Sequence, residues 1–364
     1  MSPKTAVDHS LLHSVVNNAG LPTNLVDGAA GHIAAHALIH SIVGLGLPTV
    51  ISPGDGGHNA ASAALATWRA ANSIEVPAGG DLRAIMAAGP AGSTYVLAGA
   101  TYEIGATPLT PKSGDAVIGQ PVTRGPLGQI TATTKIHGTS ASGVFRSPFN
   151  AAAFRLENVE LWGSSTTGIH HFNAFKLTMR YCRIHDNLEA GLGARAGSLI
   201  EFSEIDHNGS AAYVNSSGGG MKFAFGTSIL TVRNCYVHDN IGEGIWWDCD
   251  ARGGTAEGNL VVGNTLSGIF IEISSGDGGG FFVQGNTVQG NNTSVAAIYA
   301  GILVVDSQNV TINNNILGGN GAGRGINLFQ DSRSTLGHAG CNGGFPNLNI
   351  TGSGNVLNGD SSDL

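Results

Sequence analysis

The sequence has little charge, since aspartate, glutamate, lysine and arginine make up 12% of its 364 residues. The formal net charge is −8, so the chain lacks the basic excess that contacts to nucleic-acid phosphates require, and we expect no nucleic-acid partner. No apolar run is long enough to cross a bilayer, and the N-terminus has no apolar stretch of signal-peptide length. We therefore expect neither membrane insertion nor export by a signal peptide.

Asparagine and glycine recur in a repeated sequence pattern along the second half of the chain. Each repeat has an apolar residue, then (in every repeat but the first) an asparagine about three positions later, and then a glycine that begins an apolar strand. The apolar residues are Leu161, Ile184, Ile205, Val237, Val261, Val288 and Leu317. Their core spacing of 21 to 24 residues, lengthened by insertions near residues 210–219 and 292–300, fits one turn of a parallel β-coil. Such coils bury their apolar sides by stacking on one another.

The repeated asparagines favour a structural role over a catalytic one. They lie at Asn187, Asn208, Asn240, Asn264, Asn291 and Asn320. Asparagine tolerates the left-handed backbone of tight turns, and stacked asparagines can bond from coil to coil as a ladder. We therefore expect these residues to form the turns of the solenoid.

The segment before the repeats indicates a cap and first strands. Residues 81–88 favour a short helix, and residues 94–97 and 100–104 favour strands. Residues 81–104 and 244–274 resemble the cap and the repeat of the pectate-lyase-like, right-handed parallel β-helix superfamily. The resemblance covers the chain from about Ile74 onward. It implies an all-β, right-handed parallel β-helix with a small α-helical N-terminal region. The same architecture carries lyases, hydrolases, epimerases and adhesins, so it does not fix a function.

The four cysteines indicate no disulfide framework. Cys182 and Cys235 fall in one inward column with Ser203 between them, so about two steps of 4.8 Å separate them, too far for a disulfide. Cys249 and Cys341 have no evident partner. We expect neither a disulfide nor a cysteine metal site.

The N-terminal region differs in kind from the repeats. Residues 9–16 and 36–43 read as two imperfect copies of a short helix, each followed by Gly-Leu-Pro-Thr. Short helices are marginal alone, so they need a partner, such as copies of themselves. We divide the chain into a helical attachment and oligomerisation region at 1–50, a linker and short helix at 51–75, and the β-helix at 76–364.

Residues 8–17, with the pattern Asp-His-x-x-Leu-His-x-x-Val-Asn, resemble the N-terminal helix of actinobacteriophage minor tail proteins. The resemblance implies a homotrimer in a virion tail, made in the host cytoplasm and joined to other tail proteins through residues 1–50. Histidines repeat at i, i+4 spacing here, which can bind zinc. No glutamate completes a zinc-protease motif, and we favour helix contacts and assign no metal site. These histidines are His9, His13, His32, His36 and His40.

Alternation along the strands places two columns of side chains on one outer face. Trp246 stacks beside Phe270, and Asp248 beside Glu272. An exposed aromatic pair next to carboxylates suits a sugar, because rings stack on apolar sugar faces and carboxylates accept hydroxyl hydrogen bonds. The glycan-binding candidates are Trp246, Phe270, Lys222, Arg195, Asn327 and Asp250.

Asp248 and Glu272 are the catalytic candidates. Carboxylates one coil apart approach the separation of about 5–5.5 Å found in retaining glycosidases, and their repulsion raises the pKa of one of them. Asp248 would act as nucleophile or base and Glu272 as acid, with the roles interchangeable. In a lyase, Asp248, Asp250 and Glu272 would instead hold Ca²⁺, with Arg252 or Lys222 as base. A solvated surface or a subunit contact are the alternatives without chemistry.

Histidines recur at one turn, as His185, His207 and His238, and we expect them to be ladder or surface groups. Three functions stay open at this point. The first is a bacteriophage tail-tip protein whose β-helix binds, and in one version degrades, host-surface polysaccharide. The second is a free polysaccharide lyase or glycoside hydrolase. The third is a purely structural virion subunit.

Overall fold

The computed structural model describes residues 73–364, except 140–141, 147–152, 171–175, 215, 225–228 and 332–344. The chain divides into two compact units, Met1–Ser73 and Ile74–Leu364. The helices and histidines predicted within residues 1–50, and the linker before residue 73, lie outside the described residues. Within the described part, no helix combines the length and the apolar character that a membrane crossing requires.

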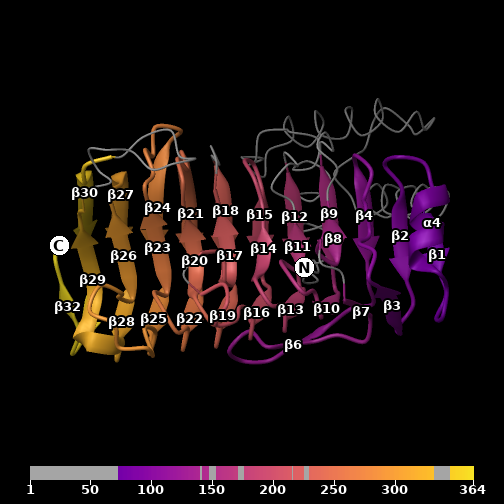
Figure 1. Cartoon of the computed structure of the whole chain (residues 1–364), viewed down its shortest axis with the longest axis horizontal. Coiled ribbons are helices and arrows are strands. Elements are labelled where there is room, and N and C mark those ends of the chain that lie inside the picture. Colours follow the sequence, from indigo (N-terminus) through magenta and orange to yellow (C-terminus); the bar gives the residue numbers. More distant parts are fainter. Residues whose placement is uncertain are drawn as a thin grey trace, which may run out of the picture. The chain divides into compact units, whose positions relative to one another are not determined.

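Three parallel sheets wind around one apolar interior, and each coil contributes one strand to each sheet (Figure 1). Sheet A contains β1 (Ser73–Val76), β2 (Thr94–Leu97), β4 (Asp115–Ile118), β9 (Phe154–Glu157), β12 (Leu177–Arg180), β15 (Leu199–Glu201), β18 (Leu230–Arg233), β21 (Gly253–Glu257), β24 (Gly280–Gln284), β27 (Gln308–Asn313) and β30 (Leu348–Ser353). The predicted β-helix is confirmed.

Sheet B follows sheet A within each coil. It contains β3 (Thr101–Gly105), β7 (Lys135–Gly138), β10 (Glu160–Trp162), β13 (Arg183–His185), β16 (Glu204–Asp206), β19 (Tyr236–His238), β22 (Leu260–Val262), β25 (Thr287–Gln289), β28 (Ile316–Gly318) and β31 (Val356–Asn358). The lead apolar residues of the repeat lie at the middle of these strands. They pair in the predicted order from Leu161 to Leu317.

Sheet C completes each coil. It contains β8 (Phe145–Arg146), β11 (Ile169–His170), β14 (Ala190–Gly193), β17 (Gly219–Phe223), β20 (Glu243–Trp247), β23 (Ile269–Glu272), β26 (Ile302–Val305), β29 (Arg324–Phe329) and β32 (Ser361–Ser362). A single 3-10 turn, η1 (Gly321–Gly323), precedes β29. The predicted insertions at 210–219 and 292–300 lie before β17 and β26, so both reach the same side of the molecule.

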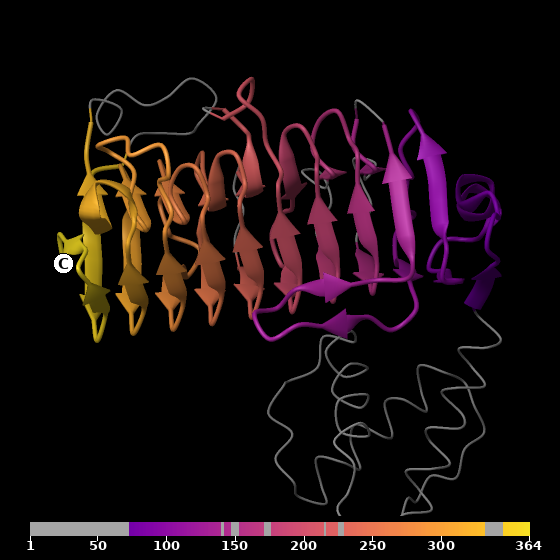
Figure 2. The ribbon, with the colours of Figure 1, turned by 90° about the horizontal axis from the view of Figure 1, so that it is seen from below.

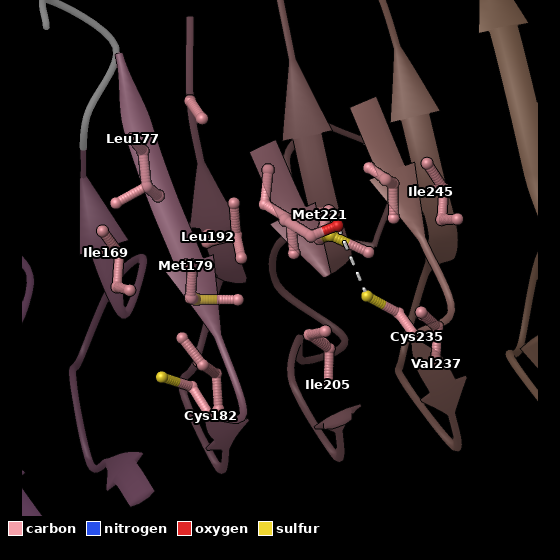
Figure 3. Packing of buried hydrophobic residues seen from close by; sticks show 14 of the residues in the cluster. Ile169, Leu177, Met179, Cys182, Leu192, Ile205, Met221, Cys235, Val237 and Ile245 are labelled. Atoms are coloured by element: carbon pink, nitrogen blue, oxygen red, sulfur yellow. Dashed lines mark hydrogen bonds between the residues drawn. The ribbon is translucent and has the colours of Figure 1, made fainter. Parts of the chain in front are cut away.

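The interior is a stack of apolar columns, because the same strand position points inward in every coil. Figure 3 shows Leu192, Met221 and Ile245, which pair from coil to coil, in this interior. Cys182 and Cys235 are buried and free, as predicted, and burial raises the pKa of each thiol to about 12. Cys249, in contrast, is disulfide-bonded, so the prediction that the chain has no disulfide is wrong.

The asparagine ladder is confirmed. The side-chain amide of each ladder residue donates to the next one, from Asn187 through Asn208, Asn240, Asn264 and Asn291 to Asn320. A second ladder joins the turns between sheets A and B, through Asn259, Asn286, Asn315 and Asn355. The sequence carries a signal for this ladder, since each of its members directly precedes a strand of sheet B.

The helix α4 (Leu82–Ala88) forms where the sequence predicts it. Asp81 caps its first turn through the amide of Ala84, and Leu82 and Met86 are buried. In Figure 1, α4 lies at the indigo end of the solenoid, beside β1 and β2. It therefore covers apolar surface of the first coil that no preceding coil buries.

A short antiparallel hairpin, β5 (Thr123–Arg124) and β6 (Ile130–Thr131), leaves the solenoid between sheets A and B. Figure 2 shows it running along the outside of the coils. Arg124 Nη2 donates to the carbonyl of Asn234 at 2.7 Å, and the amide of Ile130 donates to Glu204 Oε2 at 2.6 Å. The hairpin therefore covers part of sheet B, a contact that the sequence analysis did not predict.

Candidate functional site

The predicted outer column of sheet C exists in the structure. We call the outward side of β17, β20 and β23 the sheet C wall; it holds Lys222, Glu243, Trp246, Asp248, Phe270 and Glu272. Lys222 pairs with Trp246, and Trp246 pairs with Phe270. The Trp246 and Phe270 rings stack with centroids 5.6 Å apart and planes 15° apart. The column continues through Leu303 to Asn327, as the spacing predicts.

The predicted exposure of the aromatic pair is wrong. Trp246 and Phe270 are each 5% exposed, because they form a second apolar cluster outside the solenoid interior. Ile298 and Tyr299, from the insertion at 292–300, pack on this cluster. Burying aromatic rings under apolar side chains is favourable, so the insertion closes over the wall rather than bulging into solvent.

Asparagine side chains hold this covering loop in place. Asn292 Nδ2 donates to the carbonyls of Ala296 at 2.9 Å and Tyr299 at 3.0 Å. Asn327 Nδ2 donates to the carbonyl of Ile298 at 2.7 Å, and Asn327 is itself buried. The structure therefore places Asn327, a predicted glycan-binding residue, beneath the loop.

Lys222 links the aromatic and acidic parts of the wall. Its Nζ lies 3.4 Å from the centroid of the Trp246 ring, a cation–π contact, and 2.9 Å from Asp248 Oδ2. It also donates to the carbonyl of Ser216, in the other insertion. These contacts hold the Lys222 ammonium group over the Trp246 ring and pair its charge with the Asp248 carboxylate.

Asp248 and Glu272 lie on adjacent coils, as predicted. Asp248 directly follows Trp247, and Glu272 directly follows Ile271. Trp247 and Ile271 are register partners in the paired strands β20 and β23. Asp248 is 6% exposed and Glu272 is 8% exposed, so both carboxyl groups are largely withdrawn from water. Asp248 Oδ1 also accepts the amide of Cys249 at 2.7 Å.

Glu243 is a residue of the wall that the sequence analysis missed. It begins β20 and is 3% exposed, and among the described residues its buried Oε2 has no hydrogen-bond partner. Burial is the main cause that raises the pKa of Glu243 well above its ordinary value. A hydrogen bond from its own backbone amide and the charge of Lys222 lower this pKa, whereas the charges of Glu272 and Asp248 raise it. A signal was available, because neighbouring repeats carry small residues at this position: Ala190, Gly219, Ser267 and Ala300.

The remaining predicted residues are less closely gathered. Arg195 follows β14, so the coil of β17 separates it from Asp248, and it is half-buried. Asp250 occupies a left-handed turn with φ 62°, where its amide donates to the carbonyl of Ile273. Asp248, Asp250 and Glu272 are not among the described groups of three ligands whose atoms lie within 4.8 Å of one another. Calcium at this wall stays an untested prediction.

One group of that kind does occur on sheet B, formed by Glu204, Asp206 and His238. Its atoms already have partners: Arg183 donates to both oxygens of Asp206, at 2.9 and 2.7 Å, and Ile130 donates to Glu204. The Arg183 guanidinium already forms ion pairs with both acids, at 2.7 Å from Asp206 Oδ2 and 3.6 Å from Glu204 Oε2. These residues are therefore a buried ion-pair network beneath the hairpin.

Of the two alternatives predicted for the turn histidines, ladder or surface groups, the surface alternative holds for His207 and not for His185 or His238. His185 and His238 are each 8% exposed, whereas the side chain of His207 is 54% exposed. Burial alone would lower the pKa of His238, but its hydrogen bonds to Glu204 and Asp239 outweigh burial and raise it. Burial alone would likewise lower the pKa of His185, but its hydrogen bonds to Glu160 and Asp186 outweigh burial and raise it.

The fold and the family comparison define the chain as a right-handed parallel β-helix protein. Residues 142–316 match the family model described as right handed beta helix region. The comparison with curated proteins gives no match.

Among solved structures, the chain is similar to the A-module of the mannuronan C-5 epimerase AlgE4 of Azotobacter vinelandii, with 18% identity over 72% of this chain and 79% of the other, and a TM-score of 0.55. It is also similar to pectate lyase Pel9A, with 14% identity, coverage of 72% and 78%, and a TM-score of 0.44. A third similarity is to the tailspike gp49 of Acinetobacter baumannii bacteriophage Fri1, a capsular polysaccharide depolymerase, with 9% identity, coverage of 74% and 58%, and a TM-score of 0.37. At these identities the likeness shows the fold alone.

Replacing Ile298 and Tyr299 together with serine should uncover the aromatic pair. The change removes apolar contacts with Trp246 and Phe270, and we expect the free energy of local loop opening to fall by about 2 kcal/mol. Acrylamide quenching of tryptophan fluorescence measures the exposure, and a Trp246→Phe background identifies the signal of Trp246. Val295→Ser, at a 64% exposed position of the same loop, is the control and should leave quenching unchanged. Equal quenching in all proteins would contradict a covering role for the loop.

Proposed function

We propose that the protein is a bacteriophage tail-tip protein that binds host cell-envelope glycans at the sheet C wall and carries out acid–base chemistry on them. The observation that carries the glycan site is the set of buried acids Glu243, Asp248 and Glu272 beside the partly buried Lys222. Burying such groups costs free energy, and buried groups of this kind concentrate at functional sites. On the next coil, the positions of Phe270 and Glu272 are taken by Leu303 and Val305, so the fold itself does not require charge there.

The chemistry of the wall fits a polysaccharide. Adjacent coils are about 4.8 Å apart, which brings Asp248 and Glu272 close to the separation that double-displacement hydrolysis uses. Trp246 and Phe270 offer stacked ring faces beside these acids once the covering loop moves. The β-helix is also the fold of a module whose name places its action on mannuronan, a polysaccharide.

The tail assignment rests on residues 8–17, whose pattern resembles the N-terminal helix of actinobacteriophage minor tail proteins. In this proposal residues 1–50 form the attachment and trimerisation region, and the β-helix faces the host. Mass spectrometry of purified virions tests the location, and chemical crosslinking of the purified full chain tests the trimer. Absence of the chain from particles would favour a free polysaccharide-degrading enzyme.

The glycan site is tested with a panel of purified bacterial capsular and cell-wall polysaccharides. We expect the full-length protein to bind at least one of them and to release new reducing ends. The double variant Asp248→Asn and Glu272→Gln should lose at least about 100-fold in the rate of release. Glu257→Gln, at an exposed acid of sheet A, is the matched control. A wild-type protein that binds no polysaccharide, or a double variant that matches it, would contradict the proposal.

A further inference from the structure

We propose that Glu243 is the proton donor of the sheet C wall, a carboxyl group held in its acid form that protonates the bridging oxygen of a bound glycan. This inference rests on the proposed function and deepens it, because it assigns to Glu243 the acid role that was predicted for Glu272 or Asp248. Those two carboxyl groups then serve as the base of the same site.

The surroundings of Glu243 favour the acid form on geometric grounds. Glu243 pairs with Gly219 of β17, which has no side chain to offer a hydrogen bond. The backbone of Gly219 comes so close that a Cβ there would lie 2.3 Å from the Glu243 carbonyl oxygen. Glu243 Oε2 is buried and has no hydrogen-bond partner within the described part of the chain. A buried carboxylate with an unpartnered oxygen is far costlier than a buried carboxylic acid, so the site favours the proton.

The charged groups near Glu243 are two acids, which also favour its acid form, and one cation, which opposes it. They are Lys222 of β17, Glu272 of β23 and Asp248, which follows β20. Two of the three are acids, and their negative charge disfavours a further carboxylate. The one cation, Lys222, is bound to Asp248 at 2.9 Å. Burial, aided by the two acids and opposed by the backbone amide of Glu243 and by Lys222, raises the pKa of Glu243 well above its ordinary value.

The reaction balances as a hydrolysis. Glu243 gives its proton to the oxygen that bridges two sugars, and the bond between that oxygen and the anomeric carbon breaks. Water adds to the anomeric carbon, and a proton of that water passes to the carboxylate of Asp248 or Glu272. Proton exchange through solvent then returns Glu243 to its acid form and the base to its carboxylate form. No cofactor or oxidant is required.

Infrared difference spectroscopy of the full-length protein tests the acid form without any ligand. A protonated carboxyl group gives a carbonyl stretch distinct from that of a carboxylate, and this band shifts in D₂O. We expect wild type to show the band at pH 7, Glu243→Gln to lose it, and the matched variant Glu272→Gln to keep it. Absence of the band in wild type, or its persistence in Glu243→Gln, would overturn the inference.

Turnover of the polysaccharide that the panel identifies tests proton donation. Glu243→Gln should lower kcat by about 100-fold or more while the Kd for that polysaccharide changes less than about threefold. It should also remove the alkaline limb of the kcat profile, which a purely structural role would leave in place. Unchanged kcat with the infrared band lost would overturn proton donation. If wild type shows the band but acts on no polysaccharide, the proposed function fails and proton donation fails with it, while the acid form of Glu243 stands.

Discussion

Asn264→Ala should lower the free energy of unfolding of the β-helix by about 3–5 kcal/mol. Asn264 is fully buried, and its Oδ1 accepts the backbone amide of Asn240 at 3.2 Å and the side-chain amide of Asn240 at 2.9 Å. Its own amide donates to Asn291 Oδ1 at 2.8 Å. Alanine leaves the buried backbone amide of Asn240 without its acceptor and removes both side-chain links between the coils, and each buried group that loses a partner costs about 1–3 kcal/mol. Denaturant unfolding followed by circular dichroism measures the change.

Asn358→Ala is the matched control for the ladder. Asn358 is the same residue type in β31 of sheet B, but it is exposed at the end of the strand. We expect its replacement to change the free energy of unfolding by less than about 0.5 kcal/mol. A loss at Asn264 no larger than the loss at Asn358 would mean that the ladder contributes little to stability.

The register of the sheets could be predicted from the sequence because two signals agree in each coil from Ile184 to Leu317. The apolar residue at the centre of each sheet B strand and the ladder asparagine three positions later both point inward. The insertions at 210–219 and 292–300 fall between the ladder turn and the sheet C strand. They therefore leave the spacing between the apolar residue and the ladder asparagine unchanged. As a result, the column from Lys222 through Trp246 and Phe270 to Asn327 could be assigned despite irregular spacing.

The exposure of the wall could not be predicted in this way. Alternation identifies the side of a strand that faces away from its own coil, but it carries no information on what packs there afterwards. Ile298 and Tyr299 come from an insertion with no repeat pattern, and Ile130 reaches Glu204 across 74 positions of sequence. The insertion at 292–300 and the hairpin both cover strands through tertiary contacts between irregular segments and regular strands. Local periodicity does not encode such contacts.

Glu243 was missed for a related reason. Strict alternation along the strand from Ile245, whose side chain points inward, predicts that the Glu243 side chain also points into the solenoid. The strand does not alternate at its start, because a Cβ on Gly244 would also point inward, at Asn264 and Val261. Glu243 instead lies near the charges of the wall. An acid where the adjacent repeats have Gly219 and Ser267 was the available signal.

Glu243→Gln should stabilise the folded protein at neutral pH, and the gain should grow with pH. The folded protein keeps the Glu243 proton at pH values where the unfolded chain releases it, since burial and neighbouring acids raise its pKa above the ordinary 4.5. Above about pH 4.5 the unfolded state therefore binds fewer protons, and the free energy of unfolding of wild type falls by about 1.4 kcal/mol per pH unit from this group. The fall ends at the folded pKa. Glutamine does not titrate, so the variant lacks this slope.

The measurement is the difference in free energy of unfolding between the variant and wild type, taken from denaturant curves between pH 4.5 and pH 8. His185 and His238, whose pKa values folding also raises, are present in both proteins and cancel in this difference. Glu257→Gln, at an exposed acid, should give a flat difference. A flat difference for Glu243→Gln would show that its carboxyl group titrates alike in the folded and unfolded states. A rising difference, combined with lost turnover, would mean that the wall keeps Glu243 at the expense of stability, which is expected of a functional group and not of a structural one.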